Sequence, residues 1–214
     1  MIVSIVDYGS GNLRSVAKGF ERAISEAGLL MAVEVTSSPA RLVLADRVVL
    51  PGVGAFAECK RGLEEIPGLQ EALRSVVCDL GRPFLGICVG MQLMADQGLE
   101  NGLTTGFGWV RGNVETLASP DKRLKIPHMG WNELLFAEPR HPVLAGLMSL
   151  EHSYFVHSYK MVCKDEHNVV AWTDYGGLVT AAIAKDNLFG TQFHPEKSQE
   201  VGLRIMKNFL SWRP

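Results

Sequence analysis

Apolar runs alternate with helical periodicity along the first half of the chain. Apolar residues recur every three or four positions from Leu13 to Ala27, and Gly28 stands where a helix C-terminal cap belongs. Three short apolar runs flank and follow this helix, and they predict buried strands at Ile2–Val6, Ala32–Val35 and Arg47–Leu50. Strands that alternate with helices indicate an α/β fold, with a mixed, mainly parallel sheet and helices on both faces.

The second half of the chain has a different pattern. From Trp109 onward the apolar segments are short and rich in Val, Tyr, Phe and Thr, which is typical of strands. The clearest predicted strands are Tyr154–Tyr159, Val169–Trp172, Leu178–Ala184 and Leu188–Phe193. A last helix follows, so we expect a β extension in the second half of a single domain that spans residues 1–214.

Composition excludes several classes of protein. A chain of 214 residues with 47% hydrophobic residues can bury one large core, and a net charge of −2 offers no basic surplus for nucleic acid. No apolar run reaches the roughly 18 residues of a membrane helix, and the first residues read as a strand rather than a signal peptide. The four cysteines form no C-x-x-C pair, which argues against zinc or a disulfide scaffold. We therefore expect a cytoplasmic protein with reduced thiols.

One of these cysteines lies in a turn that suits a nucleophile. An amphipathic helix predicted at Leu69–Leu80 leads to the apolar run Pro83–Leu85, which is followed by Gly86-Ile87-Cys88-Val89-Gly90. Flanking glycines allow a sharp strand-to-helix turn that exposes its central residue, and the N-terminus of a helix favours a thiolate. The alternative is that Cys88 is a small buried hydrophobic residue, as many cysteines are.

A histidine and a glutamate lie together far downstream. His194-Pro195-Glu196 follows an apolar strand, and a cysteine nucleophile needs a base that is oriented by a third group. Proline favours an extended residue before it, and residues two apart on an extended chain point the same way, so Glu196 is predicted beside the ring of His194. The alternative is a surface histidine with a solvated acid nearby.

A glycine-rich loop supplies a third candidate motif. Pro51-Gly52-Val53-Gly54 ends a predicted sheet strand, where backbone N–H groups can turn toward an anion as in an oxyanion hole. By itself the loop is equally compatible with an ordinary turn before a helix that begins near Ala55. The three motifs together, in this order, are met in far fewer kinds of protein than any one of them alone.

In this order the three motifs resemble the class I, triad-type glutamine amidotransferases, and the resemblance spans almost the whole chain. It implies a flavodoxin-like fold in which Cys88 is the nucleophile, His194 the general acid and base, and Glu196 the orienting carboxylate. The implied oxyanion hole uses backbone N–H groups of Val89 and of the loop residues Gly52, Val53 and Gly54. The implied contacts to the glutamine substrate come from Gln92, Glu100, Ser158 and Tyr159. The family's chemistry needs no metal or organic cofactor.

Within this family, Met91-Gln92, Pro127–Asn132 and Tyr154–Tyr159 resemble the glutaminase subunits of imidazole glycerol phosphate synthases. Such subunits pass ammonia to a (β/α)₈-barrel cyclase subunit in a heterodimer, and the matching interface positions here are Asn12, Trp131 and Lys197. The alternatives are a glutaminase that serves another acceptor, a cysteine hydrolase or thioesterase that acts alone, and a binding module whose cysteine is inert.

Overall fold

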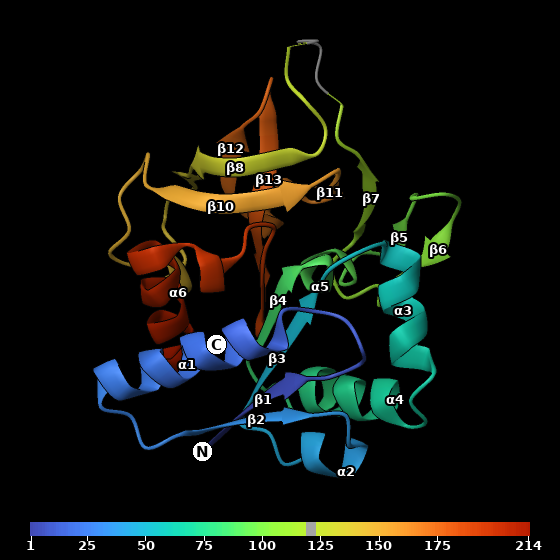
Figure 1. Ribbon diagram of the computed structural model, residues 1–214, viewed down its shortest axis with the longest axis vertical. Helices are drawn as coiled ribbons and strands as arrows, with labels where there is room; N and C mark the ends of the chain where they lie inside the picture. Colours follow the sequence, from blue (N-terminus) through green and yellow to red (C-terminus); the bar gives the residue numbers. More distant parts are fainter. Residues whose placement is uncertain (119–122) are drawn as a thin grey trace.

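An eight-stranded mixed sheet forms the centre of the computed structural model, which describes residues 1–118 and 123–214 (Figure 1). Five neighbouring strands are parallel, and the remaining three continue the sheet in antiparallel fashion. In spatial order the strands are β2 (Ala32–Thr36), β1 (Ile2–Val6), β3 (Arg47–Gly52), β4 (Phe84–Cys88), β14 (Leu188–Thr191), β13 (Leu178–Lys185), β12 (Val169–Asp174) and β9 (Leu135–Phe136). The order of the parallel strands is that of a flavodoxin-like sheet, as the sequence predicts.

Helices lie on both faces of the parallel strands. Helices α1 (Leu13–Ala27) and α6 (Gln199–Ser211) pack on each other, with the rings of Phe20 and Phe209 6.1 Å apart, while α2 (Pro39–Leu42), α3 (Phe56–Glu64) and α4 (Leu69–Arg74) group on the other side (Figure 1). The predicted boundaries of α1 are confirmed, because Gly28 has a φ of 62° and terminates the helix. Among the described residues, no helix is long and apolar enough to cross a membrane.

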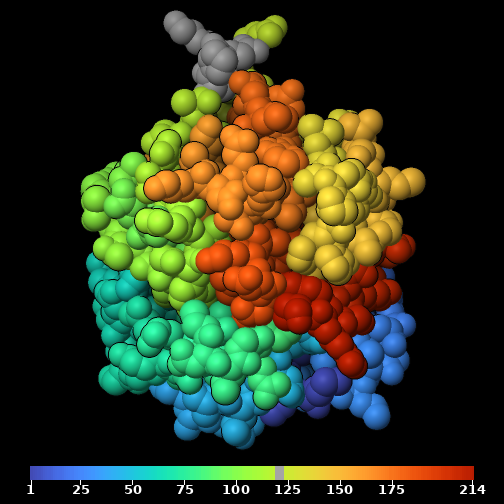
Figure 2. Space-filling view, turned by 180° about the vertical axis from the view of Figure 1, so that it is seen from behind, coloured from blue at the N-terminus to red at the C-terminus, as the bar shows by residue number. Residues whose placement is uncertain are grey.

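Two smaller sheets make up part of the β extension that was predicted for the second half. Strands β8 (His128–Glu133) and β10 (His152–His157) form one, and β11 (Tyr159–Cys163), β7 (Gly112–Thr116), β5 (Gln97–Gly98) and β6 (Thr104–Thr105) form the other. Seen from behind, the extension occupies the upper part of the molecule, above the blue and cyan segments of the first half (Figure 2). The strands predicted in the second half are therefore divided between sheets: β12, β13 and β14 continue the central sheet, whereas β8, β10, β7 and β11 form the smaller ones.

Three predicted elements differ from the structure. The strand expected at Tyr154–Tyr159 is interrupted at Ser158, because the chain leaves the β8–β10 pair there and joins β7. The strand expected to end at Phe193 ends at Thr191. The helix expected to continue to Leu80 changes after Arg74 into a π-helical turn, Ser75–Asp79.

Close packing of glycine backbone holds the short helix α5 (Val89–Gln92) over the ends of β3 and β4. A Cβ atom on Gly90 would lie 1.9 Å from the carbonyl oxygen of Leu50 in β3. No side chain fits in that space, so a glycine at this position is what allows α5 to begin directly after Cys88.

Gly90→Ala is expected to destabilise the fold by about 3 kcal/mol or more, because the atom it meets is backbone and cannot rotate away. Gly19→Ala is the matched control: its Cβ would meet the flexible Met206 side chain at 2.9 Å, inside helix α1. The control should change the free energy of unfolding by no more than about 1 kcal/mol. Urea unfolding of the two variants measures the difference, and equal stabilities would contradict the role given to Gly90.

Candidate active site

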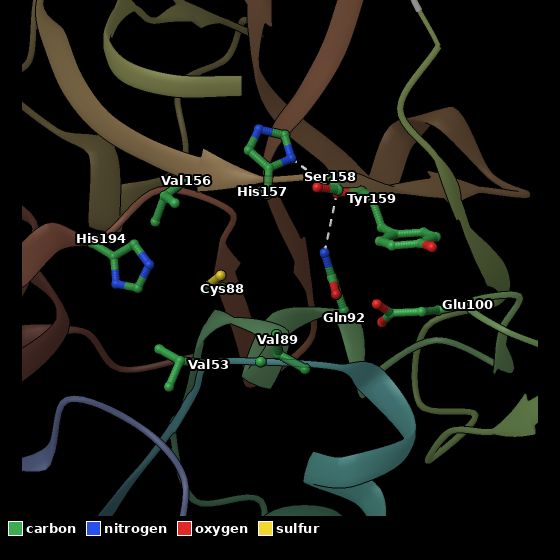
Figure 3. Close-up of a pocket in the computed structure, with 11 residues that line it drawn as sticks. Val53, Cys88, Val89, Gln92, Glu100, Val156, His157, Ser158, Tyr159 and His194 are labelled. Carbon is green, nitrogen blue, oxygen red and sulfur yellow. Dashed lines mark hydrogen bonds between the residues drawn. The ribbon is translucent and has the colours of Figure 1, made fainter. Parts of the chain in front are cut away.

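A cavity of about 160 Å³ opens at the carboxyl ends of β3 and β4, where the predicted motifs meet (Figure 3). Its walls come from the loop after β3, the turn between β4 and α5, the break between β10 and β11, and the segment after β14. The lining residues are Val53, Gly54, Cys88, Val89, Gln92, Glu100, Val156, His157, Ser158, Tyr159 and His194. Ligands of open α/β sheets bind at this edge, so the cavity is the candidate active site.

Cys88 occupies the strained position of the turn. It is the last residue of β4 and has φ 54° and ψ −112°, a conformation that residues with a side chain rarely adopt. The residue is only 4% exposed, and its sulfur faces the cavity (Figure 3). Because α5 begins at the next residue, the first N–H groups of the helix, which have no acceptor within it, directly follow Cys88 in the chain.

His194 and Glu196 form a buried pair. The Nδ1 atom of His194 lies 2.8 Å from Oε1 of Glu196, and their side chains are 2% and 1% exposed. The backbone between them is not the extended tripeptide that we expected, because Pro195–Lys197 forms a 3-10 helix. Its turn still brings the two side chains together. The segment is fixed to β10, since the His194 N–H donates to the Tyr154 carbonyl and the Tyr154 N–H donates to the Ser198 hydroxyl.

The other ring nitrogen of His194 is available for chemistry. Burial alone would lower the pKa of His194, but its contacts with Cys88 and Glu196 outweigh burial and raise the pKa to about 9. Because the Glu196 carboxylate accepts the Nδ1–H, Nε2 is left for proton exchange, and it has no hydrogen-bond partner among the described residues. Figure 3 shows the ring beside the Cys88 sulfur.

A second histidine in the cavity wall has no free ring nitrogen. His157 Nδ1 lies 2.8 Å from the carbonyl oxygen of Tyr159, and its Nε2 lies 3.0 Å from Nδ1 of His128. Both ring nitrogens of His157 are therefore occupied. Burial lowers the pKa of His157 and of His128 to about 4, so both rings are neutral at pH 7. Of the described residues that line the cavity, His194 is the histidine with a free nitrogen.

The loop after β3 is held by Ser10. The backbone N–H of Val53 donates to the Ser10 hydroxyl at 3.2 Å, and that hydroxyl donates to the Val53 carbonyl at 2.7 Å. The amide expected to face an oxyanion is thus already bonded in this state of the loop. Val89 is placed differently: it lines the cavity and is the first residue of α5, where helix N–H groups lack intrahelical acceptors.

The four residues expected to contact a substrate all line the cavity: Gln92, Glu100, Ser158 and Tyr159. Gln92 Nε2 donates to the Tyr159 carbonyl at 3.2 Å, and Oε2 of Glu100 accepts the N–H of Phe56 at the start of α3. Both side chains are therefore held in place by backbone groups of neighbouring elements.

Sequence reasoning missed Gln192, which lies against the candidate nucleophile. Its Nε2 is 3.7 Å from the Cys88 sulfur, and its Oε1 accepts a hydrogen bond from Gln92 at 3.0 Å. A signal was present, since Gln192 precedes His194 by two residues and alternate residues of an extended segment face the same side.

The expected interface positions lie apart from the cavity. Trp131 is 47% exposed, and its ring meets that of Tyr154 edge-on with centroids 6.0 Å apart. Lys197 Nζ lies 5.6 Å from the centroid of the same Tyr154 ring. The structure thus brings Trp131 and Lys197 together around Tyr154, whereas Asn12 lies at the start of α1. We call Trp131, Tyr154 and Lys197 the aromatic patch.

Comparisons with known proteins assign almost the whole chain to one family. The family model described as Glutamine amidotransferase class-I matches residues 4–212. Curated relatives called imidazole glycerol phosphate synthase subunit HisH are 52% identical in Brucella suis, 53% in Rhizobium meliloti and 54% in Rhodospirillum rubrum, each alignment covering 100% of both chains.

Solved structures resemble the fold. A glutamine amidotransferase matches with a TM-score of 0.71 at 18% identity, covering 99% of this chain and 98% of that chain. A glutamine amidotransferase from Thermotoga maritima matches with a TM-score of 0.63 at 15% identity, covering 99% of this chain and 83% of that chain.

The raised pKa of His194 predicts a pH-dependent stability. Because the folded pKa of about 9 exceeds the unfolded value of about 6.5, the stabilising effect of His194 is complete below pH 6.5 and is lost as pH rises through 9. The stability difference between the wild type and His194→Gln should therefore shrink from pH 6 to pH 10, as measured by urea unfolding. The exposed His167→Gln is the control, and a constant His194 difference over this range would refute the assignment.

Proposed function

Because the chain belongs to the class-I glutamine amidotransferase family, we propose that it is the glutaminase subunit of an imidazole glycerol phosphate synthase. It hydrolyses L-glutamine to glutamate and ammonia within a single catalytic domain. The observation that carries the proposal is the buried Cys88 on its strained turn, facing a histidine whose second nitrogen is bound to Glu196. The identity of 50–54% to full-length synthase subunits supports the pathway.

The proposed reaction proceeds through a thioester. The Cys88 thiolate attacks the side-chain amide carbon of glutamine, and His194 protonates the nitrogen as the C–N bond breaks, which releases ammonia. A γ-glutamyl thioester remains on Cys88. His194 then takes a proton from water, the resulting hydroxide attacks the thioester carbon, and the C–S bond breaks to give glutamate and the thiolate. Glu196 holds the ring of His194 in one orientation throughout.

Backbone amides stabilise the oxyanion of each tetrahedral intermediate. Val89 N–H is suited to this role because it lies at the N-terminus of α5 next to Cys88. The second donor comes from residues 52–54, and for Val53 this requires exchange of the Ser10 hydroxyl for the oxyanion. The loop is thus a two-state element that is productive when its bond to Ser10 opens.

The substrate amino acid is held by the remaining wall of the cavity. The free carboxylate oxygen of Glu100 binds the α-amino group, because Oε2 is engaged by Phe56 and an ammonium needs an anionic acceptor. Gln92 contacts the amide, and Ser158 and Tyr159 contact the substrate through the break between β10 and β11.

Ammonia passes to a partner. We assign the partner as a (β/α)₈-barrel cyclase subunit in a cytoplasmic heterodimer, where the ammonia is used to form imidazole glycerol phosphate and an aminoimidazole carboxamide ribonucleotide. The aromatic patch and Asn12 form the interface. An exposed tryptophan packed on a tyrosine supports this, since aromatic residues are enriched at interface centres. Lys197 connects the interface to the site, because it lies in the same turn as Glu196.

Cys88→Ala should reduce glutamine hydrolysis by at least about a thousandfold, because no other group can form the thioester. Complexes of the variant with the cyclase should still make product from added ammonium salts, since that chemistry belongs to the other chain. Glutamate release and product formation are measured with Cys78→Ala, an exposed cysteine, as the control. Substantial glutamine turnover by Cys88→Ala would exclude the proposed mechanism.

Lys197→Ala should lower the stimulation of glutaminase activity by cyclase plus nucleotide by at least about tenfold, because truncation of an interface charge weakens the complex. Cys88 should remain open to alkylation in this variant. The matched control is Lys164→Ala, an exposed lysine outside the aromatic patch. High activity of the isolated wild-type chain, unchanged by any cyclase, would favour a hydrolase that acts alone.

A further inference from the structure

Gln192 is a fully buried polar side chain that the reaction described above does not use. It follows the last residue of β14 and is 0% exposed. Its Nε2 lies 3.7 Å from the Cys88 sulfur, a normal length for an N–H···S hydrogen bond given the large radius of sulfur. A buried amide in this position needs an explanation, because an unpaired one is costly.

The orientation of this amide is set by its neighbours. Gln92 Nε2 donates both to the Tyr159 carbonyl at 3.2 Å and to Oε1 of Gln192 at 3.0 Å. If the Gln192 amide were rotated by 180°, its N–H would face the N–H of Gln92 and its oxygen would face the sulfur. The network therefore directs a donor, and not an acceptor, at the sulfur of Cys88.

A donor in this place matters most when the sulfur is anionic. Cys88 is 4% exposed, so water provides little solvation to a thiolate there, and a hydrogen bond to a charged acceptor is stronger than one to a neutral thiol. The same bond favours the sulfur as the leaving group when the thioester is hydrolysed, because the thiolate forms again in that step.

We propose that Gln192 is a catalytic residue, whose side-chain amide donates to the Cys88 thiolate and stabilises it beside His194. This role rests on the proposed function, since only a nucleophilic sulfur requires such a donor. Gln92 thereby has two tasks, because it lines the substrate cavity and also fixes the orientation of Gln192.

The reactivity of Cys88 tests the donor directly. The variant Gln192→Met keeps the length of the side chain and removes the donor, and the variant Gln192→Glu keeps the acceptor for Gln92 but places an oxygen at the sulfur. The matched control is Thr191→Val, which removes the neighbouring buried hydroxyl that donates to the Phe193 carbonyl at 3.0 Å. Alkylation by iodoacetamide is followed from pH 6 to pH 10 by peptide mass spectrometry, with exposed Cys78 as an internal reference.

We expect both Gln192 variants to be alkylated at Cys88 about tenfold more slowly than the wild type at pH 7, and by a smaller factor at pH 10. Thr191→Val and the Cys78 reference should not change. Wild-type rates in both Gln192 variants would overturn the proposal. So would an equal slowing at every pH, which indicates a structural role. If Gln192→Met does not fold, Gln192→Glu decides alone.

Glutamine hydrolysis separates this inference from the proposed function. Failure of the wild-type chain to hydrolyse glutamine with cyclase and nucleotide would end the proposed function, whatever the alkylation rates show. If the wild type hydrolyses glutamine and Cys88 alkylation is the same with and without Gln192, only the inference on Gln192 fails. If the wild type hydrolyses glutamine and the Gln192 variants are alkylated more slowly, the kcat of Gln192→Met should fall by about tenfold with less change in KM, because the donor acts on the reacting sulfur.

Discussion

The backbone of Cys88 is the constraint on which the site depends. A positive φ at a residue with a side chain costs about 1–3 kcal/mol, and it is maintained where the surrounding packing leaves no alternative. Here the surrounding packing is the contact of Gly90 with the Leu50 carbonyl, which seats α5 directly on β3. The strained turn places three features at one point: a sulfur at the sheet edge, the start of a helix, and the cavity that His194 also lines.

The electrostatics of the cavity follow from what each group can pair with. The charged partners His194 and Glu196 are buried together, and each compensates the other's loss of water. His157 and His128 are buried without a carboxylate, so they stay neutral and form an ordered chain of hydrogen bonds to the Tyr159 carbonyl. Of the histidines that line the cavity among the described residues, His194 is suited to carry a proton, whereas His157 stays neutral in one fixed orientation.

Two segments connect this chemistry to the surface. The 3-10 helix Pro195–Lys197 holds Glu196 in the buried pair and Lys197 against the half-buried Tyr154 ring, so the surface lysine and the buried carboxylate belong to one turn. The loop after β3 is bonded to Ser10 in the turn that also contains Asn12. Both segments are short, so each joins residues outside the cavity to the cavity wall or to the buried pair over a few positions.

Local sequence determined the elements and the three motifs of the site, whereas the substrate contacts came from the resemblance to a family. Periodicity predicted α1 and the first strands, and glycine spacing predicted the turn at Cys88. His194 and Glu196 pair as expected, but on a 3-10 turn rather than on the extended backbone from which the pairing was predicted. These are short-range properties of turns and repeats. What the sequence alone did not reveal depends on residues far apart: the bond of Gln192 to Cys88 spans 104 positions, and that of Ser10 to Val53 spans 43. The break at Ser158 belongs with these, because the pairing of β10 and β11 with different sheets is decided by where β8 and β7 lie in the fold, and no pattern within Tyr154–Tyr159 records that.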